Sequence, residues 1–264
     1  MSTIEAIILG IIQGLTEFIP ISSSGHLVIA QYYMSGASDH LFLEWINIGT
    51  VLALLIFFRH RIGGIITGII RRHDYRLAIN VVIAMIPAGL AGFLLADFIE
   101  TSAFFGSIWT VVATLIIVGI VMVVLERLPK LSPVKDEASL PRSRALTIGL
   151  AQMAALIPGT SRSGATIITG RLMGLNAATA AEFSFLVSIP IMLGVLLKLS
   201  VKAADRAYFV DNASAIIIGN IFALIAGLIA VGFLMRYLQR HSLALFGWYR
   251  IALGSIIALV LILA

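Results

Sequence analysis

The 264-residue sequence lacks cysteine altogether and is poor in charged residues. Without cysteine the chain can form no disulfide, thiolate zinc site or iron–sulfur cluster, so any metal must bind through carboxylate, amide, hydroxyl or imidazole groups. Charged residues make up 12% of the chain, whereas soluble domains carry about 25%. This scarcity excludes soluble oxidoreductases, cytosolic kinases and nucleic-acid-binding proteins as functional classes.

The N-terminal region also lacks basic residues, because the first lysine or arginine is Arg59. A signal peptide starts with a basic region, so we expect no cleavable signal. The chain is instead 60% hydrophobic, which predicts an all-α polytopic membrane protein. About 20 apolar residues cross a bilayer, and six segments approach that length: Leu41 to Phe58, Leu77 to Leu95, Ile108 to Leu125, Glu182 to Leu199, Ala213 to Met235 and Leu245 to Leu263.

Two further apolar segments, residues 4–33 and 145–175, are interrupted near their middles by a proline and a cluster of serine and glycine. Proline ends a helix, and serine caps the start of the next one. Each segment is therefore predicted to form two short helices joined by a tight break. We interpret both segments as re-entrant helical hairpins, which enter and leave the membrane on the same side.

The two halves of the sequence resemble each other. A shift of 139 residues places Gln13 on Gln152 and Ser22 on Ser161. Each repeat then contains one hairpin and three spans, and this odd number of crossings makes the second copy enter from the opposite side, as in an inverted repeat. We expect three regions: residues 1–128 as the first repeat, 129–144 as a cytoplasmic linker and 145–264 as the second repeat.

The distribution of basic residues predicts the orientation in the membrane. Thirteen of the 18 lysines and arginines fall in one set of predicted loops, and Arg250 is counted among them. That side is predicted to be cytoplasmic, which places both termini outside. We expect the site to open on the periplasmic or external face. Asp136 and Glu137 are expected to lie in a solvated part of the linker.

The first interrupted segment carries a cluster of groups suited to phosphate chemistry. Gln13 and Glu17 are four residues apart, so on a helix they point the same way. After Pro20, the run from Ser22 to His26 supplies three hydroxyls, an imidazole and a new helix N-terminus. A helix N-terminus attracts anions such as phosphate, because its backbone N–H groups are free.

The second segment repeats this arrangement and adds a cation, in the string from Pro158 to Thr166 (PGTSRSGAT). An arginine at membrane depth is costly unless it is paired, and its planar guanidinium can bind phosphate oxygens bidentately. Two tips that meet would bring Glu17 and Arg162 into one pocket. Structural alternatives remain open: the breaks can be packing kinks, and the two charges can form an ion pair that only holds the hairpins together. Glu44 and Glu182 are interpreted as supporting carboxylates or purely structural ones.

These motifs resemble those of the bacterial undecaprenyl-diphosphate phosphatase family, also called the bacitracin-resistance family. The resemblance rests on the spacing of Gln13 and Glu17, on the run from Pro20 to His26 and on the string from Pro158 to Thr166. It covers the whole chain, since length, number of spans and motif positions agree. It implies a hydrolase of the bacterial inner membrane that converts undecaprenyl diphosphate to undecaprenyl phosphate and inorganic phosphate, recycling the lipid carrier for peptidoglycan synthesis.

The resemblance also implies partners and residue roles. It implies a divalent cation, Mg²⁺ or Ca²⁺, held by Glu17 and Gln13, although a neutral amide at position 13, where many relatives have glutamate, weakens this assignment. A polyprenyl diphosphate is the expected lipid partner, and a homodimer is left open. Ser23 corresponds to the proposed nucleophile, with His26 as the alternative. The implied catalytic residues are Glu17, Ser23, His26 and Arg162, and the implied diphosphate-binding residues are Ser22, Ser24, Gly25, Ser161, Arg162, Ser163 and Thr166.

Two other functions compete with this one. Inverted repeats with broken helices are typical of secondary transporters, so a transporter or flippase for a lipid phosphate or another anion is the alternative. The motifs favour an enzyme, because a transporter needs no nucleophile beside its anion site. Type-2 phosphatidate phosphatases are excluded, since their pattern requires histidine and aspartate where this chain has Ile168 and Leu172.

Overall fold

The computed structural model describes residues 1–35 and 39–263, and within these ranges every regular element is a helix. Among the described residues, six helical segments are long and apolar enough to cross a membrane, as the sequence predicts. These segments are α3 (His40–Trp45) with α4 (Asn47–Phe57), α6 (Arg76–Leu94), α9 (Ile108–Val124), α12 (Ala177–Val201), α14 (Ala213–Tyr237) and α15 (Ala244–Leu263).

Each of the two interrupted segments forms a pair of helices joined by a break. The first pair is α1 (Thr3–Phe18) and α2 (Ser23–Ser35), and the second is α10 (Arg142–Gln152) and α11 (Arg162–Leu172), with the 3₁₀ turn η2 (Met153–Leu156) between them. Shorter elements connect the spans: α5 (Arg59–Arg72), α7 (Ala96–Thr101), α8 (Ala103–Gly106), the 3₁₀ turn η1 (Leu125–Arg127) and α13 (Ala203–Asp211).

The two breaks share one backbone geometry. Ser22 has a φ of 76° and Ser161 a φ of 73°, a left-handed conformation that residues other than glycine seldom adopt. The Ser22 hydroxyl accepts a hydrogen bond from the backbone N–H of Gly25 at 3.4 Å, and the Ser161 hydroxyl accepts one from Gly164 at 3.1 Å. Each serine therefore caps the helix that follows it, which turns the chain sharply at the matching point of both pairs.

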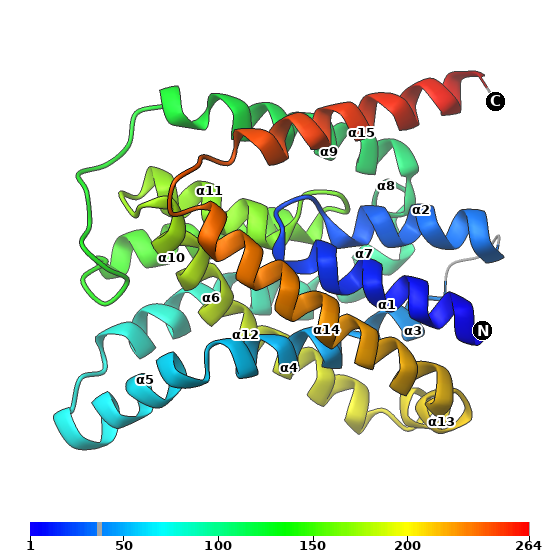
Figure 1. Cartoon of the computed structure of the whole chain (residues 1–264), viewed down its shortest axis with the longest axis horizontal. Coiled ribbons are helices and arrows are strands. Elements are labelled where there is room, and N and C mark those ends of the chain that lie inside the picture. Colours follow the sequence, from blue (N-terminus) through cyan, green and yellow to red (C-terminus); the bar gives the residue numbers. More distant parts are fainter. Residues whose placement is uncertain (36–38, 264) are drawn as a thin grey trace.

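Each helix pair packs against a span from the other half of the chain. Helix α1 lies along α14, whereas α10 lies along α6 (Figure 1). Small residues allow these helices to approach closely, since a Cβ atom on Gly10 would collide with the carbonyl of Gly219, and one on Gly149 would lie 2.5 Å from the carbonyl oxygen of Ala84. The two halves are therefore interleaved rather than separate.

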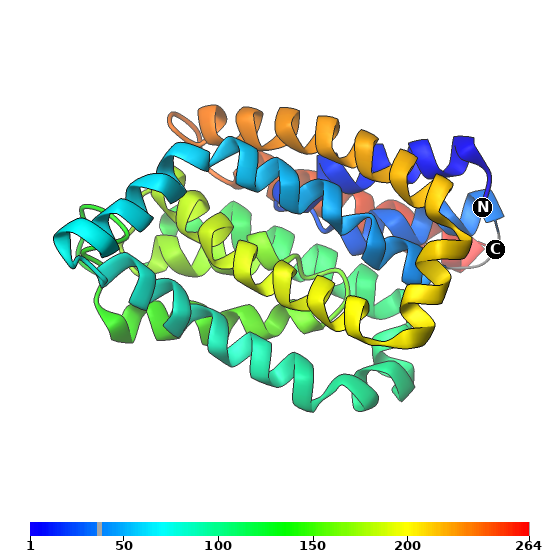
Figure 2. The same ribbon diagram turned by 90° about the horizontal axis from the view of Figure 1, so that it is seen from below.

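The spans run roughly along the long axis of the molecule (Figures 1 and 2). Both termini lie at one end, and α5 lies at the opposite end together with the connection between α9 and α10. The loops richest in arginine are thus on the far side of the molecule from the termini, as the distribution of basic residues predicts.

The expectation that Glu137 lies in a solvated loop is wrong. Its side chain is buried, and one of its oxygens accepts a hydrogen bond from Arg61 at 3.1 Å. Arg61 also pairs with Glu182 at 2.6 Å, and the Asn80 amide donates to the carbonyl oxygens of Glu137 and Leu140. Burial raises the pKa of the Glu137 carboxyl above its ordinary value. The linker is therefore packed onto the helices, because these polar side chains satisfy its backbone.

Candidate active site

A cavity of about 460 Å³ lies beside the first break. One part of its wall is polar, formed by Gln13, Glu17, Ser23, Ser24, Glu44 and Asn47. Another part is apolar, formed by Leu27, Val28, Phe105, Ile108 and Val111, and Pro158 of the second break completes the lining. A cavity with polar groups on one side and apolar groups on the other suits a ligand with a charged head and a hydrocarbon tail.

The Glu17 carboxylate connects the two breaks. One oxygen accepts a hydrogen bond from the Arg162 guanidinium at 2.5 Å, which is also an ion pair. The other oxygen accepts one from the Ser23 hydroxyl at 2.6 Å and one from the Gln13 amide at 3.3 Å. Both charged side chains are mostly shielded from solvent, with exposed fractions of 13% for Glu17 and 17% for Arg162. The two tips therefore meet at this ion pair, although Arg162 itself is not part of the cavity lining.

The contact between Ser23 and Glu17 has the geometry of a nucleophile beside its base. A serine hydroxyl becomes a useful nucleophile when a neighbouring group accepts its proton, and the reach for such a transfer is about 2.6–3.2 Å. Ser23 is the first residue of α2, so its hydroxyl also lies where the backbone N–H groups of the helix N-terminus are free. A phosphoryl group placed here would meet a hydroxyl, its base and several hydrogen-bond donors.

His26 points away from this arrangement. Its Nδ1 atom lies 2.7 Å from the carbonyl oxygen of Ser22, and its Nε2 atom lies 2.7 Å from the hydroxyl of Tyr249 on α15. The two rings are nearly parallel, with centroids 5.7 Å apart. His26 therefore contacts the turn and α15, whereas Ser23 is the residue that contacts Glu17.

The residues expected to bind phosphate differ in their contacts. The hydroxyls of Ser22 and Ser161 cap helices, and each also lies within hydrogen-bond distance of the serine two residues later, Ser24 at 3.2 Å and Ser163 at 3.1 Å. Arg162 has one buried nitrogen, Nη1, without a partner among the described residues. An unpaired buried guanidinium N–H is costly, and phosphate oxygens are well suited to accept from it.

Thr166 is separated from the cavity. Its side chain is buried, and its hydroxyl lies 2.6 Å from that of Ser184 on α12. The same hydroxyl donates back to the carbonyl oxygen of Arg162 at 2.9 Å. In this position Thr166 connects α11 to α12 and stabilises the helix that carries Arg162. Gly25 lies at the start of α2, where its N–H is used by the Ser22 cap.

Asn47 was not predicted to belong to the site, and Arg250 was predicted in the wrong place. The Asn47 side-chain oxygen accepts a hydrogen bond from the Gln13 amide at 2.6 Å, which orients that amide beside Glu17. Arg250 was counted among the cytoplasmic loop residues, and this is wrong because it lies inside α15 and is fully buried. Both are polar residues within an apolar run, which is the signal that would have identified them.

The Arg250 guanidinium binds backbone atoms from both breaks. It donates to the carbonyl oxygen of Pro20 at 3.2 Å and to that of Gly159 at 2.6 Å. A third hydrogen bond of 3.3 Å reaches the carbonyl oxygen of Thr114 on α9. One side chain therefore joins the two tips that carry Ser23 and Arg162.

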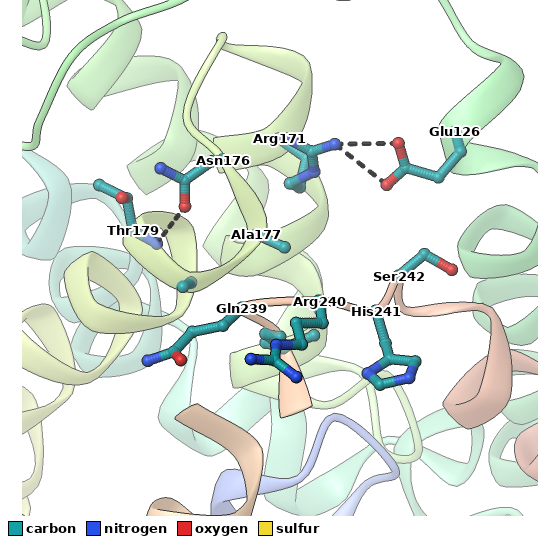
Figure 3. A pocket seen from close by; sticks show the side chains of 11 residues that line it. Glu126, Arg171, Asn176, Ala177, Thr179, Gln239, Arg240, His241 and Ser242 are labelled. Carbon is teal, nitrogen blue, oxygen red and sulfur yellow. Dashed lines mark hydrogen bonds and ion pairs between the residues drawn. The ribbon is translucent and has the colours of Figure 1, made fainter. Parts of the chain in front are cut away.

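A second cavity, of about 630 Å³, contains none of the residues predicted for the site. On its wall, one guanidinium nitrogen of Arg171 donates to both carboxylate oxygens of Glu126, at 3.1 and 2.9 Å (Figure 3). The Asn176 side chain caps α12 by accepting a hydrogen bond from the Thr179 N–H. Arg240, from the connection between α14 and α15, completes this part of the wall. These contacts are those of a structural junction between helix ends.

Comparison with known proteins gives consistent matches over the whole chain. The sequence profile of the bacitracin resistance protein BacA family matches residues 6–256. An undecaprenyl-diphosphatase of Rubrobacter xylanophilus is 38% identical, with the alignment covering 100% of both chains. An enzyme of that name from Clavibacter michiganensis is 38% identical over 99% of this chain and 97% of its own, and one from Acinetobacter baumannii is 40% identical over 96% and 94%.

Proposed function

Because the chain belongs to the bacitracin resistance protein family, we propose that it is an undecaprenyl-diphosphatase. It is a multi-pass membrane enzyme that hydrolyses undecaprenyl diphosphate to undecaprenyl phosphate and inorganic phosphate. This activity returns the lipid carrier to peptidoglycan synthesis and accounts for the link to bacitracin resistance.

The observation that carries this function is the joint contact of Glu17 with Ser23 and Arg162. It combines a nucleophile and its base on the wall of a partly apolar cavity with a phosphate-binding cation that contacts this base from behind the lining. The lining fits a lipid diphosphate, since the head can meet Ser23 and Glu17 while the tail lies against Leu27 and Val28. A transporter would need the cation but not the nucleophile with its base, so that alternative is not favoured.

The mechanism that we propose proceeds in two steps. Glu17 accepts the proton of Ser23 as Oγ attacks the terminal phosphorus, and the bond from phosphorus to the bridging oxygen breaks, releasing undecaprenyl phosphate. Glu17 passes this proton to the departing phosphate oxygen and then accepts one from a water molecule that attacks the phosphoserine phosphorus. The bond from phosphorus to Oγ breaks, inorganic phosphate is released, and Glu17 returns the proton to Ser23. Arg162 stabilises the charge on the equatorial oxygens throughout, which is the main requirement of phosphoryl transfer. His26 is the alternative nucleophile, and its contacts with Ser22 and Tyr249 make it the less direct choice.

The donor set at the cavity fits a hard divalent cation such as Mg²⁺ or Ca²⁺, because carboxylate and amide oxygens are its preferred ligands. Glu17 and Gln13 are the proposed ligands, and Glu44 and Asn47 add oxygen atoms to the same wall. When bound, the cation would neutralise charge on the diphosphate. The side chains of Ser23 and Arg162 contact Glu17 directly.

We also propose the membrane arrangement expected from the sequence. The two helix pairs are re-entrant hairpins of an inverted repeat, in the bacterial inner membrane, with the cavity open to the periplasmic side. In support, the matching left-handed serines at the two breaks obey the 139-residue shift. The cavity wall includes residues of α3 and α8, which lie near the end that carries both termini (Figure 1).

The test is phosphate release from a C55 or C15 prenyl diphosphate by the purified protein in detergent, with and without chelator. We expect metal-dependent release that Ser23→Ala and Arg162→Ala abolish and that the exposed control variants Ser200→Ala and Arg206→Ala retain. No release by a folded wild type would contradict the enzyme assignment. Full activity of Ser23→Ala with loss in His26→Ala would instead transfer the nucleophile role to the histidine.

A further inference from the structure

Three arginines from three different helices surround a cavity of about 500 Å³ at the end of the molecule opposite the termini. Arg72 is the last residue of α5, Arg76 the first of α6 and Arg142 the first of α10. Arg72 and Arg76 flank one short turn, whereas Arg142 follows Arg76 by 66 residues, so only the fold brings it beside the other two. The remaining wall is formed by His73, Asp74, Tyr75 and Ile79.

The positive charge of this cavity is only partly neutralised. Asp74 is the acidic residue on its wall, and both of its oxygens accept hydrogen bonds from the Arg76 guanidinium, at 2.9 and 2.8 Å. Within residues 1–35 and 39–263, Arg72 and Arg142 make no side-chain hydrogen bond or ion pair. The arginines and Asp74 leave two excess positive charges on one small surface.

The cavity lies where an apolar span begins. Helix α6 is long and apolar enough to cross a membrane and starts at Arg76, so this residue marks the boundary between hydrocarbon and water. Tyr75 is 46% exposed beside it, and tyrosines are enriched at this depth because the ring is apolar and the hydroxyl polar. An anion bound here would therefore sit at the level of the lipid headgroups.

Helix α5 supplies an apolar surface next to the cavity. None of its residues is buried, and Ile66 and Ile70, one turn apart, are 51% and 69% exposed. Positions 63, 64 and 68 are glycines whose missing side chains leave open space around them. Helix α5 has basic residues at both ends and projects at the end of the molecule (Figures 1 and 2). The exposed isoleucines of this helix therefore offer an apolar surface that lipid chains can contact.

We propose that the Arg72–Arg76–Arg142 cavity binds the phosphate headgroup of an anionic phospholipid, whose acyl chains lie against Ile66 and Ile70 of α5. Guanidinium groups recognise phosphate by charge and by paired hydrogen bonds, and basic pockets between membrane helices on the cytoplasmic side are suited to such headgroups. The exposed isoleucines favour a lipid over free phosphate. This site is separate from the Glu17 cavity and binds a lipid that is not the substrate.

The test is native mass spectrometry of the detergent-purified full chain with phosphatidylglycerol or phosphatidylcholine of identical acyl chains. We expect wild type to retain one phosphatidylglycerol molecule selectively. The double variant Arg72→Gln/Arg142→Gln should bind it at least about tenfold more weakly. The control Arg236→Gln/Arg240→Gln removes the same charge at the same end of the molecule and should bind like wild type.

Three results would overturn the proposal: equal retention by the Arg72→Gln/Arg142→Gln variant and wild type, an equal loss in the control variant, or equal retention of the two lipids. A further measurement adds glycerol phosphate to the lipid complex. Displacement of the lipid at equimolar concentration would show that the site binds free phosphate instead, which would also overturn the proposal. Melting temperatures without lipid, together with phosphatase activity, verify that both variants are folded. Because lipid retention is measured directly, its outcome does not depend on whether the chain is a phosphatase.

Discussion

At the scale of single residues, Glu17 has the most contacts with other candidate catalytic groups. It contacts a serine on its own tip and an arginine on the other, and so combines the roles of base and counter-ion. A buried pair of this kind is costly to break, because the remaining charge stays without a partner. Substitutions at Glu17 therefore test chemistry and structure together.

Glu17→Gln is expected to lower kcat by at least about 100-fold, since a positioned base contributes 10²–10⁴-fold. The amide keeps the shape of the side chain but neither accepts the Ser23 proton nor neutralises Arg162. The measurement is phosphate release under saturating substrate, with melting temperature as the folding check. Glu5→Gln is the matched control at the exposed start of the same helix and should behave like wild type. Activity within tenfold of wild type would remove Glu17 from the role of base.

Arg250→Leu is expected to lower the free energy of unfolding by at least about 2 kcal/mol, because each buried carbonyl left unpaired costs about 1–3 kcal/mol. The carbonyl oxygens of Pro20, Thr114 and Gly159 would all lose their donor. Thermal unfolding in detergent measures this effect, and Arg250→Lys should restore part of the stability. Arg240→Leu, at an exposed position, is the control. Equal melting temperatures for Arg250→Leu and wild type would contradict the role of this side chain in joining the tips.

At the scale of elements, the sequence predicts what depends on local pattern and misses what depends on distant contacts. The six spans follow from apolar length alone, and the two breaks follow from Pro20 and Pro158 with the serines behind them. The burial of Glu137 depends on Arg61 and Asn80, which are more than 50 residues away in the chain. The place of Arg250 also depends on carbonyls of other elements. Such contacts leave no periodic signal, so local pattern could not predict them.

The same limit applies to the site. The motifs predict that Glu17, Ser23 and Arg162 belong together, because a hydroxyl, a base and a cation form a recognisable set for phosphate chemistry. Asn47, which orients Gln13, lies on another helix. Thr166 belongs to the motif string, but its hydroxyl contacts Ser184. Motif membership therefore does not give the direction in which each side chain points.

Gly159→Ala is expected to displace the second tip. Gly159 has a φ of 86°, and an added Cβ would collide with the Thr114 hydroxyl and lie 2.8 Å from the carbonyl oxygen of Val111. Because the residue also precedes Arg162, we expect reduced stability and loss of phosphate release. Gly63→Ala on α5 meets no atom within 4 Å and should be neutral or stabilising by up to about 1 kcal/mol. Wild-type activity of Gly159→Ala would show that the tip tolerates displacement.

The linker provides a prediction for pH dependence. Burial raises the pKa of Glu137, so the folded protein binds this proton more tightly than the unfolded chain. Its contribution to stability is present below the ordinary glutamate pKa and is lost as the pH rises through the raised folded value. The effect of neighbouring Asp136 on the pH dependence of stability has the opposite sign. Hydrogen bonds from Ser139 lower the pKa of Asp136, so its contribution to stability is lost as the pH falls.

The measurement is the melting temperature from pH 4 to 7 for wild type, Glu137→Gln and Asp136→Asn. Relative to Glu137→Gln, wild type should become less stable with rising pH. Relative to Asp136→Asn, wild type should become more stable over the lower part of this range. Parallel curves for wild type and Glu137→Gln would show that the pairing with Arg61 offsets burial completely.

At the scale of the whole molecule, the halves are interleaved, because α1 packs on α14 and α10 on α6. A chain ending at residue 128 would expose the faces of α1 and α6 that the second half covers. We therefore expect residues 1–128 and 129–264, expressed separately, to be degraded or to aggregate. Co-expression of the two pieces should restore prenyl diphosphate hydrolysis, measured in purified membranes. A stable, monodisperse first half on its own would contradict this account of the packing.

The two breaks share a backbone conformation but carry different chemistry. The 139-residue shift that matches their capping serines places Ser23 on Arg162. A symmetric assembly of two copies of one half would thus present two serines or two arginines, and never the pair that Glu17 joins. Under the proposed inverted repeat, the difference at this one matched position is what separates the catalytic hydroxyl from the phosphate-binding cation.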